Sequence, residues 1–131
     1  MDIITGPDGF IYLADWYDSR LSHVDPRDTW SKTTGRIYRL RSSNSKPGVS
    51  TFDISAYSND QLIGLFSGKN RWFRQQAMLE LGNRKDNSLV PQLLNILKSD
   101  TGQVALEALW ALHLSDGFNE IAALTALRHS D

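Results

Sequence analysis

An internal repeat with a period of 31 residues organises the second half of this sequence. The segment at 61–66 reads QLIGLF, and the segment at 92–97 reads QLLNIL. At the same offset, AMLEL at 77–81 is followed by ALWAL at 108–112. Two short amphipathic helices that recur at such a period are typical of an α-solenoid, whose units bury their apolar faces only against their neighbours. The repeat therefore predicts a stack of helix pairs.

Local signals place the ends of five predicted helices. Four starts carry a side chain that can cap the first turn, at Ser58 with Gln61, at Asn70, at Asn87 or Ser88, and at Asp100 or Thr101. Gly82 is predicted to end the second helix. The fifth helix is predicted over 118–128, where the third copy of the repeat begins. Its pairing helix is missing, so we expect Ile121, Leu124 and Leu127 to be exposed.

The first part of the chain carries β patterns instead. Strands are predicted where the residue pattern is extended or alternating, at 2–5, 10–16, 35–40 and 51–54. Pro7 and Gly9 favour a tight turn between the first two strands. The segment 42–48, rich in Ser, Gly and Pro, is the predicted linker.

These patterns predict a mainly α fold with a small antiparallel β segment. The β part and its linker are assigned to 1–48, and the helical repeats to 49–131. Within the repeats, the predicted units are about 58–87, about 88–118 and an incomplete 119–131.

The predicted connection at 17–34 is far longer than the two to five residues of a usual hairpin loop. With the end of the preceding strand it supplies a candidate site of charged side chains, Asp15, Asp18, Arg20, His23, Asp25 and Asp28. Long loops often carry function because a rigid scaffold can present them to a ligand. The structural alternative is a surface insertion whose Asp and Arg side chains pair with one another. The regular spacing of an EF-hand is absent, so no metal site is assigned.

Composition and the absence of several motifs exclude some classes of function and partner. The formal net charge is −1 and no basic stripe is visible, so we expect no nucleic-acid partner. No apolar run approaches the roughly 20 residues of a membrane helix, so we expect no membrane contact. The absence of cysteine excludes disulfides, thiolate metal sites, a Cys nucleophile and covalent c-type haem attachment in this chain. Trp72 and Trp110 lie in predicted helices, and we expect them to pack in the core or between repeats.

Four segments resemble a known family, in the order in which that family has them. GPDGFIYLADWYD at 6–18 and TGRIYRL at 34–40 are similar to the last propeller blade of the PVC-type membrane-bound dehydrogenases, which are large bacterial proteins. NRWFRQQA at 70–77 and LEALWALH at 106–113 are similar to the first helical repeats of the same family. The resemblance covers nearly all of the chain. It implies a partial β-propeller blade followed by a HEAT-like α-solenoid.

The resemblance also implies what a complete family member does. It has a six-bladed, quinoprotein-like propeller, HEAT-like repeats and often a cytochrome c segment with a CxxCH motif. It is expected to oxidise sugars or alcohols in the periplasm or cell envelope, with a quinone such as PQQ and with haem c as cofactors. This chain matches one blade and lacks the haem motif. We therefore expect it to hold no cofactor and to be inactive by itself.

Three functions remain as hypotheses. The first is a non-catalytic fragment of a dehydrogenase-like bacterial protein, whose HEAT-like repeats act as a scaffold or interaction surface. The second is a stand-alone HEAT-like module that binds a protein, and the third is an enzyme that uses the acidic loop at 17–34. The expected partner is a protein, either the rest of a longer parent protein or a second copy. Unpaired strand edges and a bare last helix favour a homodimer.

Overall fold

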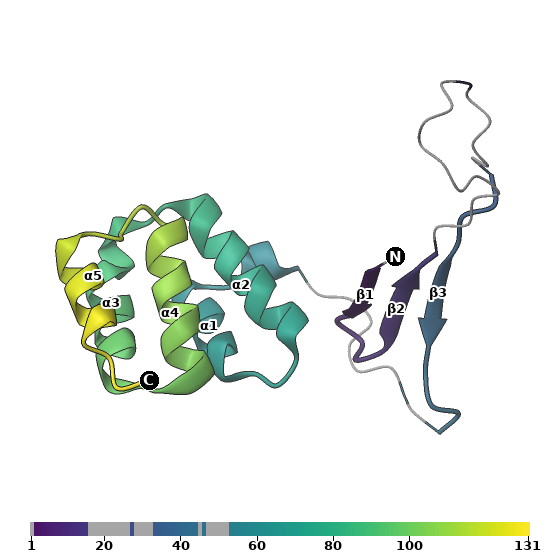
Figure 1. Ribbon diagram of the computed structural model, residues 1–131, viewed down its shortest axis with the longest axis horizontal. Helices are drawn as coiled ribbons and strands as arrows, with labels where there is room; N and C mark the ends of the chain where they lie inside the picture. The colour runs from purple at the N-terminus through teal and green to yellow at the C-terminus, as the bar shows by residue number, and fades with distance from the viewer. Residues whose placement is uncertain (1, 16–26, 28–32, 45, 47–52) are drawn as a thin grey trace. The chain divides into compact units, whose positions relative to one another are not determined.

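The computed structural model describes residues 2–15, 27, 33–44, 46 and 53–131. The chain divides into two compact units, Met1–Ser50 and Thr51–Asp131. The first unit holds a three-stranded antiparallel sheet, and the second holds the helices (Figure 1). The fold is thus mainly helical with a small antiparallel sheet, as the sequence predicts.

The sheet of the first unit has the strand order β1–β2–β3. Its strands are β1 (Asp2–Thr5), β2 (Ile11–Ala14) and β3 (Ile37–Leu40). Leu13 of β2 pairs with Ile3 on one side and with Tyr38 on the other, which fixes the register. Since successive residues of a strand point to opposite faces, one face gathers Ile3, Thr5, Ile11, Leu13, Tyr38 and Leu40. That face is apolar except for one threonine.

The turn between β1 and β2 is built around a carboxylate. Asp8 Oδ1 accepts from the backbone N–H of Phe10 at 3.1 Å, and Asp8 Oδ2 accepts from the Tyr12 hydroxyl at 2.8 Å. Gly9 adopts a φ of 80°, as the predicted turn requires. Burial raises the pKa of Asp8, but the hydrogen bonds from Tyr12 and Phe10 and the charge of Arg39 outweigh it and lower that pKa. The turn therefore favours an ionised carboxyl group.

The prediction of a strand at 51–54 is wrong for residues 53 and 54, the two that the structure describes. Residues 51 and 52 lie outside the described residues, and Ile54 begins a 3₁₀ helix, η1 (Ile54–Ala56). Asp53 Oδ1 accepts from the backbone N–H of Ser55 at 2.9 Å and from its hydroxyl at 2.6 Å. Asp at such a position favours a turn over an extended strand, because its side chain replaces a backbone hydrogen-bond partner.

The helical unit consists of two helix pairs and one further helix. Its other elements are α1 (Asn59–Gly64), η2 (Leu65–Ser67), α2 (Arg71–Arg84), η3 (Asn87–Leu89), α3 (Val90–Ser99), α4 (Gly102–Leu114) and α5 (Glu120–Leu127). Helix α4 contacts α2, α3 and α5, and α3 also contacts α5 (Figure 1).

Two predicted helix starts are confirmed by their hydrogen bonds. Ser58 and Gln61 form a reciprocal capping box, with Gln61 N to Ser58 Oγ at 3.2 Å and Ser58 N to Gln61 Oε1 at 2.8 Å. Asn70 Oδ1 accepts from the backbone N–H of Trp72 at 3.0 Å and caps α2. Thr101 stands at the cap position of α4, although its side chain makes no capping bond.

Gly82 does not end α2, contrary to the prediction. The helix continues to Arg84 and ends at Lys85, which adopts the left-handed conformation with a φ of 49°. A Cβ atom at Gly82 would lie 3.0 Å from Cβ of Leu114. The glycine therefore permits the close approach of α2 and α4 instead of terminating a helix.

The cap predicted before the third helix is displaced. Asp86, not Asn87 or Ser88, supplies the capping oxygen: its Oδ1 accepts from the backbone N–H of Ser88 at 3.0 Å and from its hydroxyl at 2.6 Å. This cap opens η3, which leads directly into α3 with Pro91 in its first turn.

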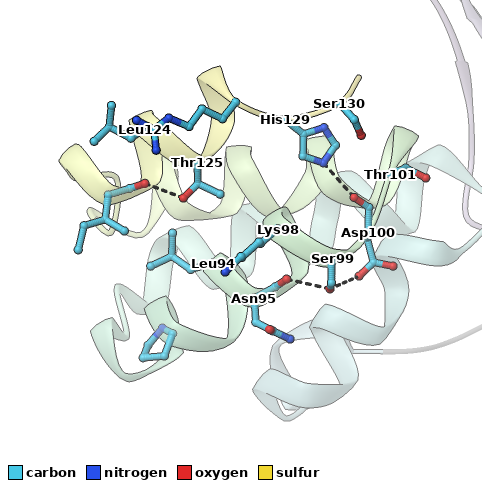
Figure 2. Close-up of a pocket in the computed structure, with 13 residues that line it drawn as sticks. Leu94, Asn95, Lys98, Ser99, Asp100, Thr101, Leu124, Thr125, His129 and Ser130 are labelled. Atoms are coloured by element: carbon cyan, nitrogen blue, oxygen red, sulfur yellow. Dashed lines mark hydrogen bonds between the residues drawn. The ribbon is translucent and has the colours of Figure 1, made fainter.

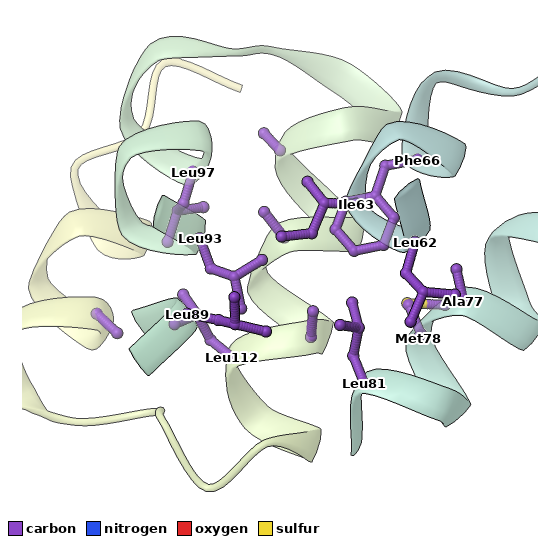
Figure 3. Close-up of a cluster of buried hydrophobic side chains, with 14 residues drawn as sticks. Leu62, Ile63, Phe66, Ala77, Met78, Leu81, Leu89, Leu93, Leu97 and Leu112 are labelled. Carbon is purple, nitrogen blue, oxygen red and sulfur yellow. The ribbon is translucent and has the colours of Figure 1, made fainter. Parts of the chain in front are cut away.

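The core of the helical unit follows the 31-residue repeat. Leu62 and Leu93 occupy equivalent positions in the two helix pairs, as do Leu81 and Leu112, and all four are fully buried. The whole cluster is drawn in Figure 3 and comprises Leu62, Ile63, Phe66, Ala77, Met78, Leu81, Leu89, Leu93, Leu97, Ala105, Ala108, Ala111, Leu112 and Ala122. Repeated sequence positions therefore build one continuous core.

Two leucines of α2 offer a matched test of this core. We expect Leu81→Ala to lower the free energy of unfolding by about 2–5 kcal/mol, because it leaves a cavity at a fully buried site. Leu79→Ala, at a side chain that is 53% exposed, should change it by about 0.5 kcal/mol or less. Urea unfolding followed by circular dichroism measures both. Equal losses would show that the buried side of α2 is wrongly assigned.

Candidate functional site: an apolar face on helices α2 and α4

The charged loop predicted as a candidate site falls mostly outside the described residues. This holds for Asp18, Arg20, His23, Asp25 and Asp28. Asp15 is described: it follows β2, is half-buried, and its backbone N–H donates to the carbonyl of Arg36 at 2.8 Å. The described part of the chain thus contains one of the six predicted site residues, and its described hydrogen bond is a backbone bond of the sheet.

The helical unit carries a different candidate, a stripe of large apolar side chains on α4. Leu106, Trp110 and Leu114 follow one another at intervals of four residues, so they share one side of the helix. They are 38%, 44% and 39% exposed. Leu79, which occupies in α2 the repeat position of Trp110, is also exposed, and α2 contacts α4. We name these four residues the α2–α4 apolar face.

Trp110 was predicted to pack in the core or between repeats, and the first of these is wrong. Trp110 lies on the side of α4 opposite Ala108 and Leu112, which fill the core, so its ring is left at the surface. Trp72 is half-buried, and its ring meets that of Phe73 edge to face with centroids 5.2 Å apart. Exposed large aromatic side chains are more typical of binding surfaces than of core packing.

A buried ion pair fixes α4 against α2. Arg74 Nε donates to Glu107 Oε1 at 2.9 Å, and the side chains of the two residues are only 14% and 2% exposed. Gln103 Nε2 donates to the same oxygen at 2.7 Å. Arg74 Nη1 also donates to the carbonyls of Gly68 and Lys69, before α2. The pair thus joins the first helix pair to the second, a role that sequence reasoning missed.

A second polar network ties the start of the first helix pair to the start of the second. Asn59 Nδ2 donates to Asp86 Oδ2 at 2.9 Å, while Arg84 Nη1 donates to Asn59 Oδ1 at 2.8 Å and Arg84 Nη2 to the carbonyl of Ser55 at 2.9 Å. Hydrogen bonds from the hydroxyl and backbone of Ser88 lower the pKa of Asp86, and the bond from Asn59 adds to them against the opposing effect of burial. The network therefore favours an ionised carboxyl group at this cap.

Within the described ranges, no three or more His, Asp or Glu side chains are grouped so that they could hold a metal ion. None of the described helices is both long enough and apolar enough to cross a membrane.

Comparisons of the chain with protein families, with curated proteins and with solved structures gave no match.

Removal of the Arg74 charge tests the buried ion pair. We expect Arg74→Met to lower the free energy of unfolding by about 3–5 kcal/mol, because it leaves the Glu107 carboxylate buried without a cation. Combining it with Glu107→Leu should recover much of that loss. Urea unfolding of the single and double variants measures the coupling. Additive losses in the double variant would contradict a direct interaction.

The lowered pKa of Asp86 predicts a pH dependence of stability. The folded state binds fewer protons at Asp86 than the unfolded chain does, so this contribution is complete above the ordinary Asp pKa of 3.8. It is lost as the pH falls through the lower folded-state pKa. Asp86→Ala should lower the free energy of unfolding at pH 7, and the loss should shrink progressively below pH 3.8. Urea titrations at stepped pH measure this, and a constant difference between the two proteins would contradict it.

Proposed function

We propose that this chain is a non-catalytic part of a dehydrogenase-like bacterial protein, and that its helical unit is a scaffold of HEAT-like repeats that binds a protein partner. The single observation that carries the proposal is the α2–α4 apolar face, where large apolar side chains stand exposed on two neighbouring helices. Solenoids of stacked helix pairs present extended surfaces of this kind to their partners.

Local structure that recurs with the sequence supports the repeat architecture. Lys85 and Asp116 follow α2 and α4 at equivalent positions, and both adopt left-handed backbone with φ of 49° and 58°. Their side chains meet, with Lys85 Nζ 2.7 Å from Asp116 Oδ2. Asp53 and Asp86, which are 33 residues apart and so not at the same position of the 31-residue repeat, cap η1 and η3 with the same pair of bonds to a serine two residues on. Equivalent turns support the view that the two pairs are copies of one unit.

The exposed sheet supports the assignment of the first unit to a propeller blade. Ile3, Ile37 and Leu40 are 63%, 77% and 55% exposed. A small sheet with so much bare apolar surface is unusual in isolation, since such sheets need a second layer for stability. In a β-propeller each blade packs its faces against neighbouring blades. The partial blade is thus consistent with a longer parent protein.

The chemistry of the α2–α4 apolar face indicates the kind of partner. It holds one aromatic and three aliphatic side chains and no ionised group. A protein segment that offers apolar side chains at helical spacing, such as an amphipathic helix, matches such a face. Trp110 is the expected energetic centre, because a few aromatic side chains usually dominate the energy of an interface.

A photo-crosslinking experiment tests the proposed function. Benzoylphenylalanine replaces Trp110 in one variant and Asn87, an exposed residue of η3, in a matched control, and both are expressed in the native cells. We expect one discrete protein adduct from position 110 and none from position 87. Mass spectrometry identifies the protein in the adduct. Trp110→Ala should then weaken binding of that purified partner by about tenfold or more.

Two outcomes would contradict this proposal. The same adducts from both positions would show that Trp110 marks no specific interface. Purified chain mixed with PQQ and a sugar or alcohol should not reduce an artificial electron acceptor. Turnover that disappears in Asp18→Ala or His23→Ala would favour an enzyme that uses the loop at 17–34.

A further inference from the structure

Helix α5 buries one small side chain, that of Ala122, and exposes its large apolar ones. Ala122 is fully buried in the core, whereas Ile121, Leu124 and Leu127 are 65%, 44% and 83% exposed, as the sequence predicts for these three. An ordinary surface helix directs its large apolar residues inward. Leu93 stands 31 residues before Leu124 and is fully buried. The outer side of α5 therefore has the composition of an interface.

The exposed residues of α5 form a pattern that is complementary to itself. Ile121 and Leu127 lie three residues before and after Leu124, and Glu120 and Arg128 lie four residues before and after it. At about 100° per residue, all five fall within about 60° of the direction of Leu124. Glu120 and Arg128 are both exposed. One face thus carries three apolar residues, with an acid near one end and a base near the other.

An antiparallel copy of the same face matches this pattern. When two such helices cross at Leu124 around a two-fold axis, Leu124 meets Leu124, and Ile121 lies level with Leu127 of the other copy. Each Glu120 then lies level with Arg128 of the other copy, at both ends of the contact. A parallel pairing would instead place Glu120 beside Glu120 and Arg128 beside Arg128, which repel each other. Charge and shape therefore select one arrangement.

A hollow beside α5 extends the apolar surface. A cavity of about 850 Å³ lies between α3 and α5. Pro91, Leu94, Ile121 and Leu124 form its apolar part, and polar side chains that include Lys98, Asp100 and Arg128 line the rest. Figure 2 shows Leu94 and Leu124 at this cavity. Side chains of a second helix placed over Leu124 can therefore find apolar surface on α3 as well.

We propose that two copies of this chain associate through the outer face of α5, antiparallel about a two-fold axis at Leu124. A second copy is assigned as the occupant because the acid of each α5 then lies level with the base of the other. This surface shares no residue with the α2–α4 apolar face. In the chain of residues 1–131, the dimer can therefore be tested separately from partner binding at the α2–α4 apolar face.

The oligomeric state of the full chain tests the contact. Sedimentation equilibrium over a range of concentrations should show a monomer–dimer equilibrium. Leu124→Glu should weaken dimerisation by about tenfold or more, because it places two carboxylates together at the two-fold axis. Asn87→Glu, which adds the same charge at an exposed residue of η3 outside both proposed surfaces, should leave the dissociation constant unchanged. Circular dichroism shows whether each variant is folded.

Cysteine pairing tests the direction of the helices, since the natural chain contains no cysteine. Leu124→Cys should form a disulfide-linked dimer on mild oxidation, because facing residues at the crossing can approach within the Cα separation of about 7 Å that a disulfide allows. Ile121→Cys mixed with Leu127→Cys should give mixed dimers, and Ile121→Cys alone should give few. Efficient pairing of Ile121→Cys with itself would overturn the antiparallel arrangement.

Charge exchange provides a further readout. Glu120→Arg or Arg128→Glu alone should weaken the dimer, and the combined variant should restore it, since each acid again faces a base. A monomer at high concentration, together with unreactive Leu124→Cys, would overturn the proposal. Dimers that persist in Leu124→Glu would also overturn it, because the contact would then lie elsewhere.

Discussion

The helical unit depends on the buried contact between Arg74 and Glu107. Burial of the two charges is costly, and their attraction offsets that cost only when the geometry is good. The guanidinium reaches Glu107 of α4 and the carbonyls of Gly68 and Lys69 at once, so a single group holds α2, the turn before it and α4. Glu107 Oε2 has no protein partner among the described atoms. We infer that the pair contributes more to the register between the helix pairs than to net stability, since a shift would leave Glu107 buried alone.

Local signals in the sequence were sufficient to predict most helix starts. They were insufficient where tertiary contacts determine the role of a residue. Ser58 and Asn70 cap helices because their partners lie within three residues. Gly82 looked like a helix end, yet its role is set by Leu114, which is distant in sequence. The sheet was predicted in outline, and its strands are shorter than the alternation suggests. A charged residue inside a helix, such as Glu107, is predicted to be exposed unless its distant partner is known.

The apolar face could have been predicted in part from the repeat. Leu79 and Trp110 recur at the same repeat position, and that position lies on the side of each helix away from the buried alanines. A large apolar residue kept on the outward side in both copies indicates a surface with a partner. The signal was missed because tryptophan is most often assigned to the core. For the loop at 17–34, charged residue types alone favour surface pairing over function, since charged loops are mostly solvated.

The two proposed surfaces have a consequence when they act together. A dimer through α5 leaves Leu79 and Trp110 outside the contact, because they belong to α2 and α4. Each dimer would then present two copies of the α2–α4 apolar face. A partner that carries two matching segments could engage both, and the second contact would form at a high effective concentration. Weak apolar binding at each face would thus become strong for a bivalent partner and remain weak for a monovalent one, provided that the two segments span the distance between the faces.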